Sequence, residues 1–100
     1  MRGNIRAREI KAESTATWPD YVFAKEYKLP SLEDAERYIK EKGHLKGIPS
    51  EKEVETNGVN LGEMNAKLLE KIEELTLHLI EMEKKQKKLQ IELDHLRKIK

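Results

Sequence analysis

Residues 61–100, LGEMNAKLLEKIEELTLHLIEMEKKQKKLQIELDHLRKIK, decide the fold of this chain. Along this stretch apolar side chains recur at alternating intervals of four and three residues, which is the spacing of the d and a positions of a heptad repeat. The d series is Leu61, Leu68, Leu75, Met82, Leu89 and Leu96, and the a series is Asn65, Ile72, Leu79, Gln86 and Leu93. We call these residues the seam. A straight helix drifts away from a strict seven-residue period, so the repeat predicts partner helices that supercoil with it.

The flanking residues favour parallel partners. In a parallel pair each g residue faces the following e residue of its neighbour, which gives the pairs His78–Glu83, Lys85–Gln90 and Glu92–Arg97. None of these pairs is repulsive, although exposed pairs contribute only about 0–1 kcal/mol each. Ile72 at an a position favours two strands, whereas Leu79 and Leu93 at a positions weaken that preference. The number of chains therefore stays open on these residues alone.

Apolar residues outside the seam gather near the N-terminal half of the predicted helix. They are Met64, Leu69, Leu77 and Ile80. We interpret them either as a docking face for the segment upstream or as room for a third helix. Beyond Met82 the residues outside the seam are mostly Lys, Glu and Gln, which indicates a narrow stalk.

Three helix start signals precede or open this stretch. A Ser or Asn is followed three residues later by an acidic residue, the arrangement of a capping box or a close variant of it. The pairs are Ser31 with Asp34, Ser50 with Glu53, and Asn60 with Glu63. They predict a helix over about 32–42 that ends at Gly43, a short helix that ends at Asn57-Gly58, and the start of the long helix.

The rest of the chain divides by composition. Residues 1–17 are polar, and the alternation around 4–12 predicts an exposed strand, with a helix as the alternative. Residues 18–60 hold all five aromatic residues and all three prolines. We expect three parts: an N-terminal strand (1–17), an aromatic collar with two short helices (18–60), and an oligomerisation helix (61–100). The predicted fold is mainly α, with a short strand, an aromatic-rich loop segment and a parallel coiled coil.

The collar consists of Trp18, Tyr21, Phe23 and Tyr27. We expect it to pack as a hydrophobic collar on the long helix near Leu69 and Leu77. The alternative is a pocket or surface that contacts a glycan or a protein receptor, because aromatic faces serve both purposes.

The composition excludes several classes of function. Charged residues make up 39% of the chain and hydrophobic residues 37%, so one chain has little apolar material for a core of its own. Lys and Arg number 20 against 19 acids, which lacks the basic excess of a nucleic-acid binder. Cysteine is absent. We find no signal-peptide core and no stretch apolar enough to insert into a membrane, and we expect the chain to be a fragment of a longer protein.

We expect no catalytic, metal or cofactor site. His44, His78 and His95 fall in a loop and at two outward-facing heptad positions, so one chain does not gather them into a metal site. Ser50 is better explained as a helix cap than as a nucleophile. Lys84, Lys85, Lys87 and Lys88 are diluted by neighbouring acids and match a solvated coiled-coil exterior.

The chain strongly resembles a C-terminal module of bacterial tail-fibre-like and cell-surface repeat proteins. The matching residues include Gly3-Asn4-Ile5-Arg6-Ala7-Arg8-Glu9-Ile10-Lys11, Trp18-Pro19-Asp20-Tyr21-Val22-Phe23, Tyr27-Lys28-Leu29-Pro30-Ser31-Leu32, His44-Leu45, Gly47-Ile48-Pro49-Ser50, Asn60-Leu61-Gly62-Glu63-Met64-Asn65 and Leu68-Leu69-Glu70-Lys71-Ile72-Glu73-Glu74-Leu75-Thr76. Lys46 departs from the family pattern, which has proline between the leucine and the glycine.

This resemblance implies a structural role and no enzymatic activity. It implies a trimeric foot that holds three fibre chains in register, similar in role to the intramolecular chaperone domains of phage tail spikes. A dimer stays possible on the seam residues but does not fit the threefold fibres of the resemblance. The resemblance also implies a place on a virion, a phage-tail-like particle or a bacterial cell surface, where a receptor or glycan would be the only other partner.

Overall fold

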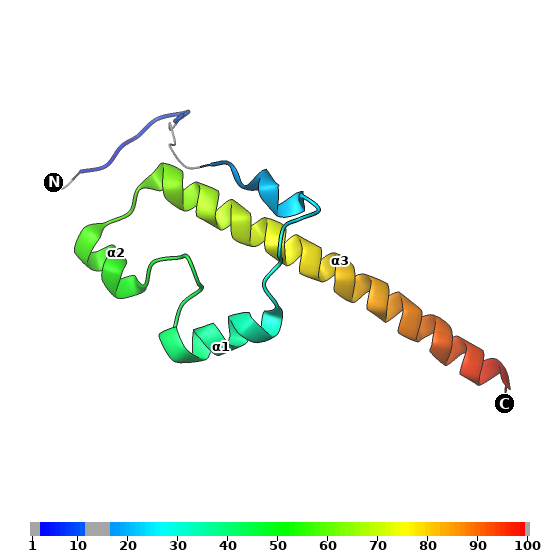
Figure 1. The fold of residues 1–100 in the computed structure, drawn as a ribbon. Coiled ribbons are helices and arrows are strands. Elements are labelled where there is room, and N and C mark those ends of the chain that lie inside the picture. The colour runs from blue at the N-terminus through cyan, green and yellow to red at the C-terminus, as the bar shows by residue number, and fades with distance from the viewer. Residues whose placement is uncertain (1–2, 12–16, 100) are drawn as a thin grey trace.

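The computed structural model describes residues 3–11 and 17–99 as a mainly helical chain built on one long helix. The elements in order are a 3-10 helix η1 (Pro19–Phe23), α1 (Leu32–Lys42), α2 (Glu51–Asn57) and α3 (Leu61–Ile99). The molecule measures 71 × 33 × 29 Å, and α3 forms its long axis (Figure 1). The predicted long C-terminal helix and the two short helices before it are confirmed.

The three helices α1, α2 and α3 begin where the sequence predicts. At each start a side-chain oxygen accepts a hydrogen bond from the backbone N–H three residues later, which satisfies a donor that the first turn leaves free. The bonds are Asp34 N–H to Ser31 Oγ at 3.0 Å, Glu53 N–H to Ser50 Oγ at 3.2 Å, and Glu63 N–H to Asn60 Oδ1 at 3.0 Å. The bond at Ser50 is reciprocated by Glu53, which completes a capping box.

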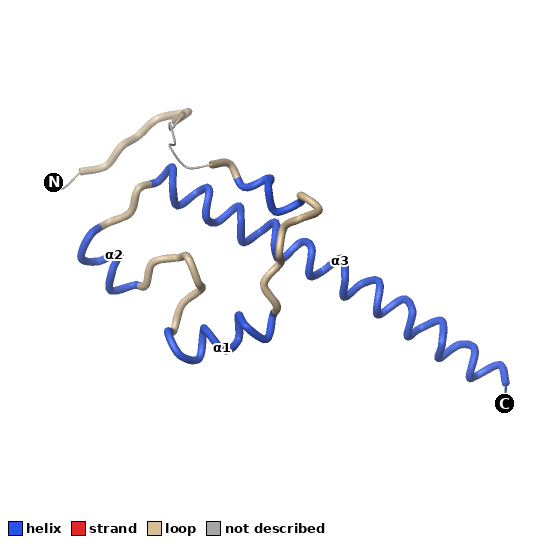
Figure 2. Tube along the Cα trace, in the orientation of Figure 1, coloured by secondary structure: helices blue, strands red, loops and turns tan. Residues whose placement is uncertain are grey.

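Helix α1 ends at Gly43, as predicted. Gly43 has φ +79°, in the left-handed region that glycine adopts without a steric penalty. Its N–H donates to the carbonyl of Ile39 at 2.8 Å and so satisfies one of the last acceptors of the helix. The short connections keep α1 and α2 as two separate helices that follow one another on a single excursion from α3 (Figure 2).

The predicted N-terminal strand is wrong for the residues that the structure describes. Residues 3–11 are irregular and fully exposed, and no strand occurs among the described residues (Figure 2). Residues 1–2 and 12–16 of the predicted N-terminal part (1–17) lie outside the described residues. The physical reason is that a strand needs a neighbour to pair its N–H and C=O groups, and residues 3–11 have none within the described chain.

The core of one chain is very small. Among the described residues only Pro19, Val22, Ala66, Glu73 and Glu74 are buried. They lie where η1 packs against the first half of α3, and η1 is the only described element with Cα atoms within 8 Å of α3. A core this small leaves most of the apolar surface of the chain in contact with water.

Replacement of Ser50 by alanine tests the capping of α2. We expect Ser50→Ala to remove the bond from the Glu53 N–H and to cost about 1 kcal/mol of local helix stability, or roughly fivefold faster amide exchange in α2. NMR hydrogen exchange measures it. Lys52→Ala, on the same helix, leaves the cap intact and serves as the control. Equal exchange rates in the two variants would contradict the assigned cap.

Candidate oligomerisation interface

The seam residues lie along one face of α3, and that face is open to solvent. Each apolar side chain of the seam is between 44% and 68% exposed, from Leu93 to Leu61. The polar seam residues Asn65 and Gln86 are exposed as well. Single exposed leucines are ordinary on protein surfaces, but a continuous exposed row of this length is uncommon on a monomer and makes this face a candidate interface.

The opposite face of α3 is the one that the rest of the chain covers. Counted from Leu61 at position d, the buried residues Ala66 and Glu73 fall at b and Glu74 at c. Positions b, c and f face away from the seam of a coiled coil. The buried contacts of the chain therefore lie on the back of its own long helix, and the a and d side chains remain exposed.

Residues 18–30, which we call the strap, bind α3 through a row of three hydrogen bonds along the helix. The hydroxyl of Tyr21 donates to Glu70, and the hydroxyl of Tyr27 donates to Glu74. One turn further along, His78 Nε2 lies 2.9 Å from the carbonyl oxygen of Pro30. Because a carbonyl oxygen only accepts, Nε2 is the donor. The α3 partners are four residues apart, so the strap follows one face of α3 in the direction of the helix.

Apolar packing supports the same contact. Val22 is 1% exposed, and Pro19 is equally buried. Both come from η1, whose backbone lies within 8 Å of α3, and Ala66 is the buried apolar residue on the α3 side. The rings of Tyr21 and Tyr27 lie 5.9 Å apart at 42°, a favourable tilted arrangement.

The collar aromatics do not form the hydrophobic core that the sequence suggested. Trp18 is 59% exposed and Phe23 is 54% exposed, while Pro19 and Val22 take the buried positions. Tyr27 is half-buried, and Tyr21 is largely exposed although its hydroxyl is bound. In a five-residue 3-10 helix only one side can face α3, so Trp18 and Phe23 are directed elsewhere.

Electrostatics keep the two tyrosines in their protonated, donating form. The hydrogen bond to the Glu70 carboxylate raises the pKa of Tyr21 to about 12, with burial adding to it. Burial first, and then the bond to Glu74, raises the pKa of Tyr27 well above its ordinary value. Lys71 Nζ lies 3.4 Å from Glu74 Oε1 and 3.7 Å from Glu70 Oε1. Its positive charge offsets part of the negative charge of these carboxylates.

A buried carboxyl, Glu73, lies beside the exposed acid Asp20 at the strap contact. Glu73 is 5% exposed, and its Oε1 has no hydrogen-bond partner. Burial first, and then hydrogen bonding and repulsion with Asp20 of η1, raise the pKa of the Glu73 carboxyl. Protonated Glu73 can donate to Asp20, whereas ionised Glu73 would place a second negative charge in the contact.

The histidines are dispersed through the fold. The ring of His44 packs edge-on against Tyr38 at 5.5 Å, His78 binds the strap, and His95 is exposed near the end of α3. Within residues 3–11 and 17–99, no group of three His, Asp or Glu side chains is arranged to hold a metal ion. In the same ranges no helix combines the length and apolarity that crossing a bilayer requires.

Glu70, Glu73 and Glu74 were not identified from the sequence. Acidic residues at outer heptad positions are expected on any solvated coiled coil, so no local signal separated these three from the other acids of α3. Only the position of the strap shows that Glu70 and Glu74 accept hydrogen bonds from tyrosines and that Glu73 is a buried acid.

Comparisons with known proteins find no match. No family model, no curated protein and no solved structure matches this chain.

The pair of Glu73 and Asp20 predicts an unusual pH dependence for the strap. Because folding raises the pKa of Glu73, the folded state binds the proton more tightly than the unfolded state does. The contribution of Glu73 to stability is therefore fully present below its ordinary pKa and is lost as pH rises through the higher folded value. Asp20 faces it from η1, and Glu70, Lys71 and Glu74 surround it on α3.

Glu73→Gln tests this dependence. We expect glutamine, which cannot ionise, to flatten the loss of stability that begins above the ordinary pKa of a glutamate, and to stabilise the strap relative to glutamate at the higher pH values. Denaturant unfolding followed by the fluorescence of Trp18, the only tryptophan, measures it. Glu81→Gln, at an exposed position of α3, is the control. Identical pH profiles for Glu73→Gln and the wild type would contradict the raised pKa of Glu73.

Proposed function

We propose that this chain is a structural module that assembles through α3 as a parallel homo-oligomer, with a trimer favoured over a dimer, and holds the chains in register. The observation that carries the proposal is the exposed heptad seam along Leu61–Ile99. The strap lies mainly on the outer face of α3 and reaches the g flank at His78, and the a and d residues stay exposed for contact with other copies.

The energetics support association. Burial of a leucine side chain contributes roughly 1.5–3 kcal/mol, and the seam offers nine large apolar side chains per chain on α3. The core of one chain is limited to the few residues under the strap. Most of the hydrophobic stabilisation available to this sequence therefore becomes available only in the oligomer.

The polar seam residues supply registration. Asn65 and Gln86 lie at a positions in an otherwise apolar row. A buried amide is satisfied when it meets the same amide of a neighbour, and a shift by one heptad would place it against leucine or isoleucine. Both residues thus limit sliding of the chains, Asn65 near the start of the seam and Gln86 in its second half.

The fibre context rests on the resemblance to C-terminal modules of tail-fibre-like and cell-surface repeat proteins. In that setting the module would bring the chains of a fibrous protein together and fix their alignment before or during folding of the shaft. Threefold fibres favour the trimer. The setting would be extracellular, on a phage-tail-like particle or a bacterial surface.

The mass in solution tests the assembly. One chain is 11.7 kDa, so light scattering on a sizing column should give about 35 kDa for a trimer. The double variant Leu75→Asn/Leu79→Asn should dissociate it, because each change places an amide in the apolar seam. A wild-type monomer, or a double variant that stays oligomeric, would contradict the seam.

A matched pair of single substitutions sharpens this test. Leu89 and Ile91 lie two residues apart and are 65% and 69% exposed, but only Leu89 belongs to the seam. Leu89→Asn should raise the concentration at which the oligomer dissociates by at least about tenfold, whereas Ile91→Asn should leave it unchanged. Equal effects would indicate that exposure, and not heptad register, governs the association.

A second candidate function is a binding tip for a glycan or protein receptor. The exposure of Trp18 and Phe23 favours it, because both lie on the outside of the strap where a sugar ring could stack on them. This function is compatible with the oligomer and would use a different surface.

A glycan array with Trp18→Ala as the comparison separates the two functions. If the module binds a glycan through the strap, Trp18→Ala should abolish binding while the solution mass stays that of the wild type. Leu89→Asn is the converse control, since it alters the seam and leaves Trp18 in place. No binding to any glycan by the wild-type oligomer would leave the structural role as the sole function supported.

A further inference from the structure

Residues 31–59, which we call the arm, contain α1 and α2 and approach α3 without burying a residue of either helix. Neither α1 nor α2 contains a buried residue. No Cα atom of either helix comes within 8 Å of a Cα atom of α3. In Figure 1 the chain leaves η1, crosses α3 and carries the arm along the other side of the long helix.

The arm nevertheless has an apolar face. Leu32, Ala35, Tyr38 and Ile39 lie on one side of α1, and Leu32 and Ile39 are 47% and 45% exposed. An amphipathic helix is stable in water mainly when its apolar face is covered, because an isolated helix of this length is marginal. The sequence of α1 is thus suited to a partner that its own chain does not provide.

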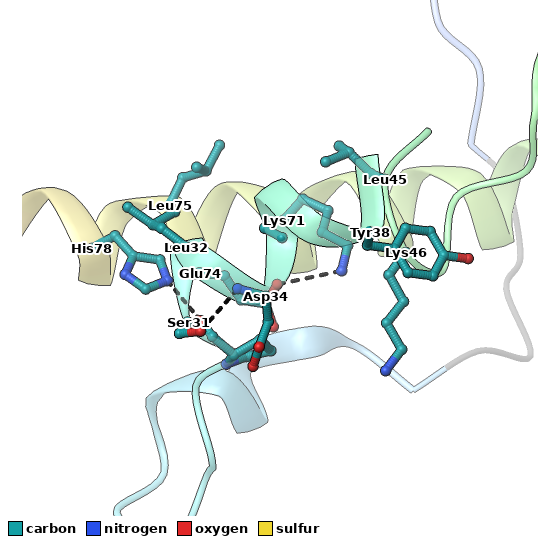
Figure 3. Close-up of a pocket in the computed structure, with 12 residues that line it drawn as sticks. Ser31, Leu32, Asp34, Tyr38, Leu45, Lys46, Lys71, Glu74, Leu75 and His78 are labelled. Carbon is teal, nitrogen blue, oxygen red and sulfur yellow. Dashed lines mark hydrogen bonds and ion pairs between the residues drawn. The ribbon is translucent and has the colours of Figure 1, made fainter. Parts of the chain in front are cut away.

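A groove of about 280 Å³ separates the arm from α3 (Figure 3). Its arm side includes Leu32 and Tyr38, and its α3 side includes Lys71, Leu75 and His78. Leu75 is a d residue of the seam, and Lys71 and His78 are at g positions. The groove therefore opens at the g flank of the seam, directly beside the proposed oligomer interface.

In a parallel coiled coil the g flank of one helix meets the e flank of the next. The chain that covers Leu75 in the seam must then place its own e and b positions at the mouth of this groove. On that flank, beyond the part of α3 covered by the strap, lie Thr76 and Ile80. Ile80 is a large apolar residue outside the seam and remains 47% exposed in one chain.

We propose that the groove between α1 and α3 receives the flank of a second copy's α3 around Ile80, so that the arm of each chain clasps its neighbour. This proposal rests on the parallel oligomer proposed above and adds a second contact to it. The clasp has a direction, since each arm lies at the g flank and reaches the e flank. In a closed ring each arm therefore contacts one neighbour, and each α3 is contacted by one arm. Leu32, which lies beside His78 of its own chain, is then the arm residue nearest to Ile80 of the neighbour.

Disulfide trapping between two differently tagged chains tests the clasp, because the wild type has no cysteine. One chain carries Leu32→Cys and the other Ile80→Cys, so a bond between them can form only across the interface. A disulfide requires Cα atoms within about 7 Å, and we expect at least about tenfold more heterodisulfide than with Leu32→Cys and Ile91→Cys. Ile91 lies three turns further along α3, which makes it the matched control.

The mass of the wild type distinguishes the two proposals. An oligomer of the expected mass that gives no more heterodisulfide than the control overturns the clasp and leaves the seam intact. A monomer overturns both. Heterodisulfide well above the control in a preparation of trimeric or dimeric mass supports the clasp.

A second measurement avoids cysteine altogether. Ile80→Gln removes the proposed apolar contact from the neighbour, so amide exchange in α1 should become at least about fivefold faster. Ile91→Gln, which alters an exposed isoleucine on the same helix, should leave α1 unchanged. Because Ile80 is not part of the arm, unchanged exchange in α1 of the Ile80→Gln oligomer would overturn the clasp.

Discussion

A row of apolar side chains that extends along a 39-residue helix can be removed from water only by another helix of similar length. That constraint governs the rest of this structure. The upstream residues are too few and too polar to cover the seam, and its apolar side chains remain exposed in one chain. The upstream residues bind mainly the outer face of α3, and the seam residues stay exposed to solvent. In the proposed oligomer, association would contribute to the stability of the folded chain.

The strap shows how a short segment attaches to a helix without a large core. Two tyrosine hydroxyls and one backbone carbonyl bind α3 at Glu70, Glu74 and His78. Each bond contributes only about 0.5–1.5 kcal/mol, or more where a charged group takes part, and Pro19 and Val22 add the apolar contact. Charge-assisted hydrogen bonds are directional, so this row of bonds sets the register of the strap along the helix. The raised pKa of Glu73 beside Asp20 predicts that the same contact weakens as pH rises.

In the proposed assembly the arm adds a second contact between neighbouring chains, beside the seam. A coiled coil specifies which faces meet, but leucine seams tolerate more than one number of strands. A clasp from α1 to the flank of the next chain would constrain the angle between neighbours as well as their alignment. The groove volume and the exposed Ile80 thus bear on oligomer size, a property that the a and d residues of this sequence leave undetermined.

Local signals determined most of the secondary structure. The caps at Ser31, Ser50 and Asn60, the stop at Gly43 and the heptad period are short-range features, and helix boundaries depend on short-range hydrogen bonds. The tertiary structure alone decided which residues of 18–30 are buried. Val22 and Trp18 are both apolar residues in the same short segment, and only the packing of η1 on α3 buries one and exposes the other. It also decided that Glu70 and Glu74 accept hydrogen bonds from strap tyrosines and that Glu73 is buried beside Asp20. Whether residues 4–11 find a neighbouring strand is likewise a tertiary property. Those outcomes depend on contacts between residues nearly fifty positions apart, which no local pattern encodes.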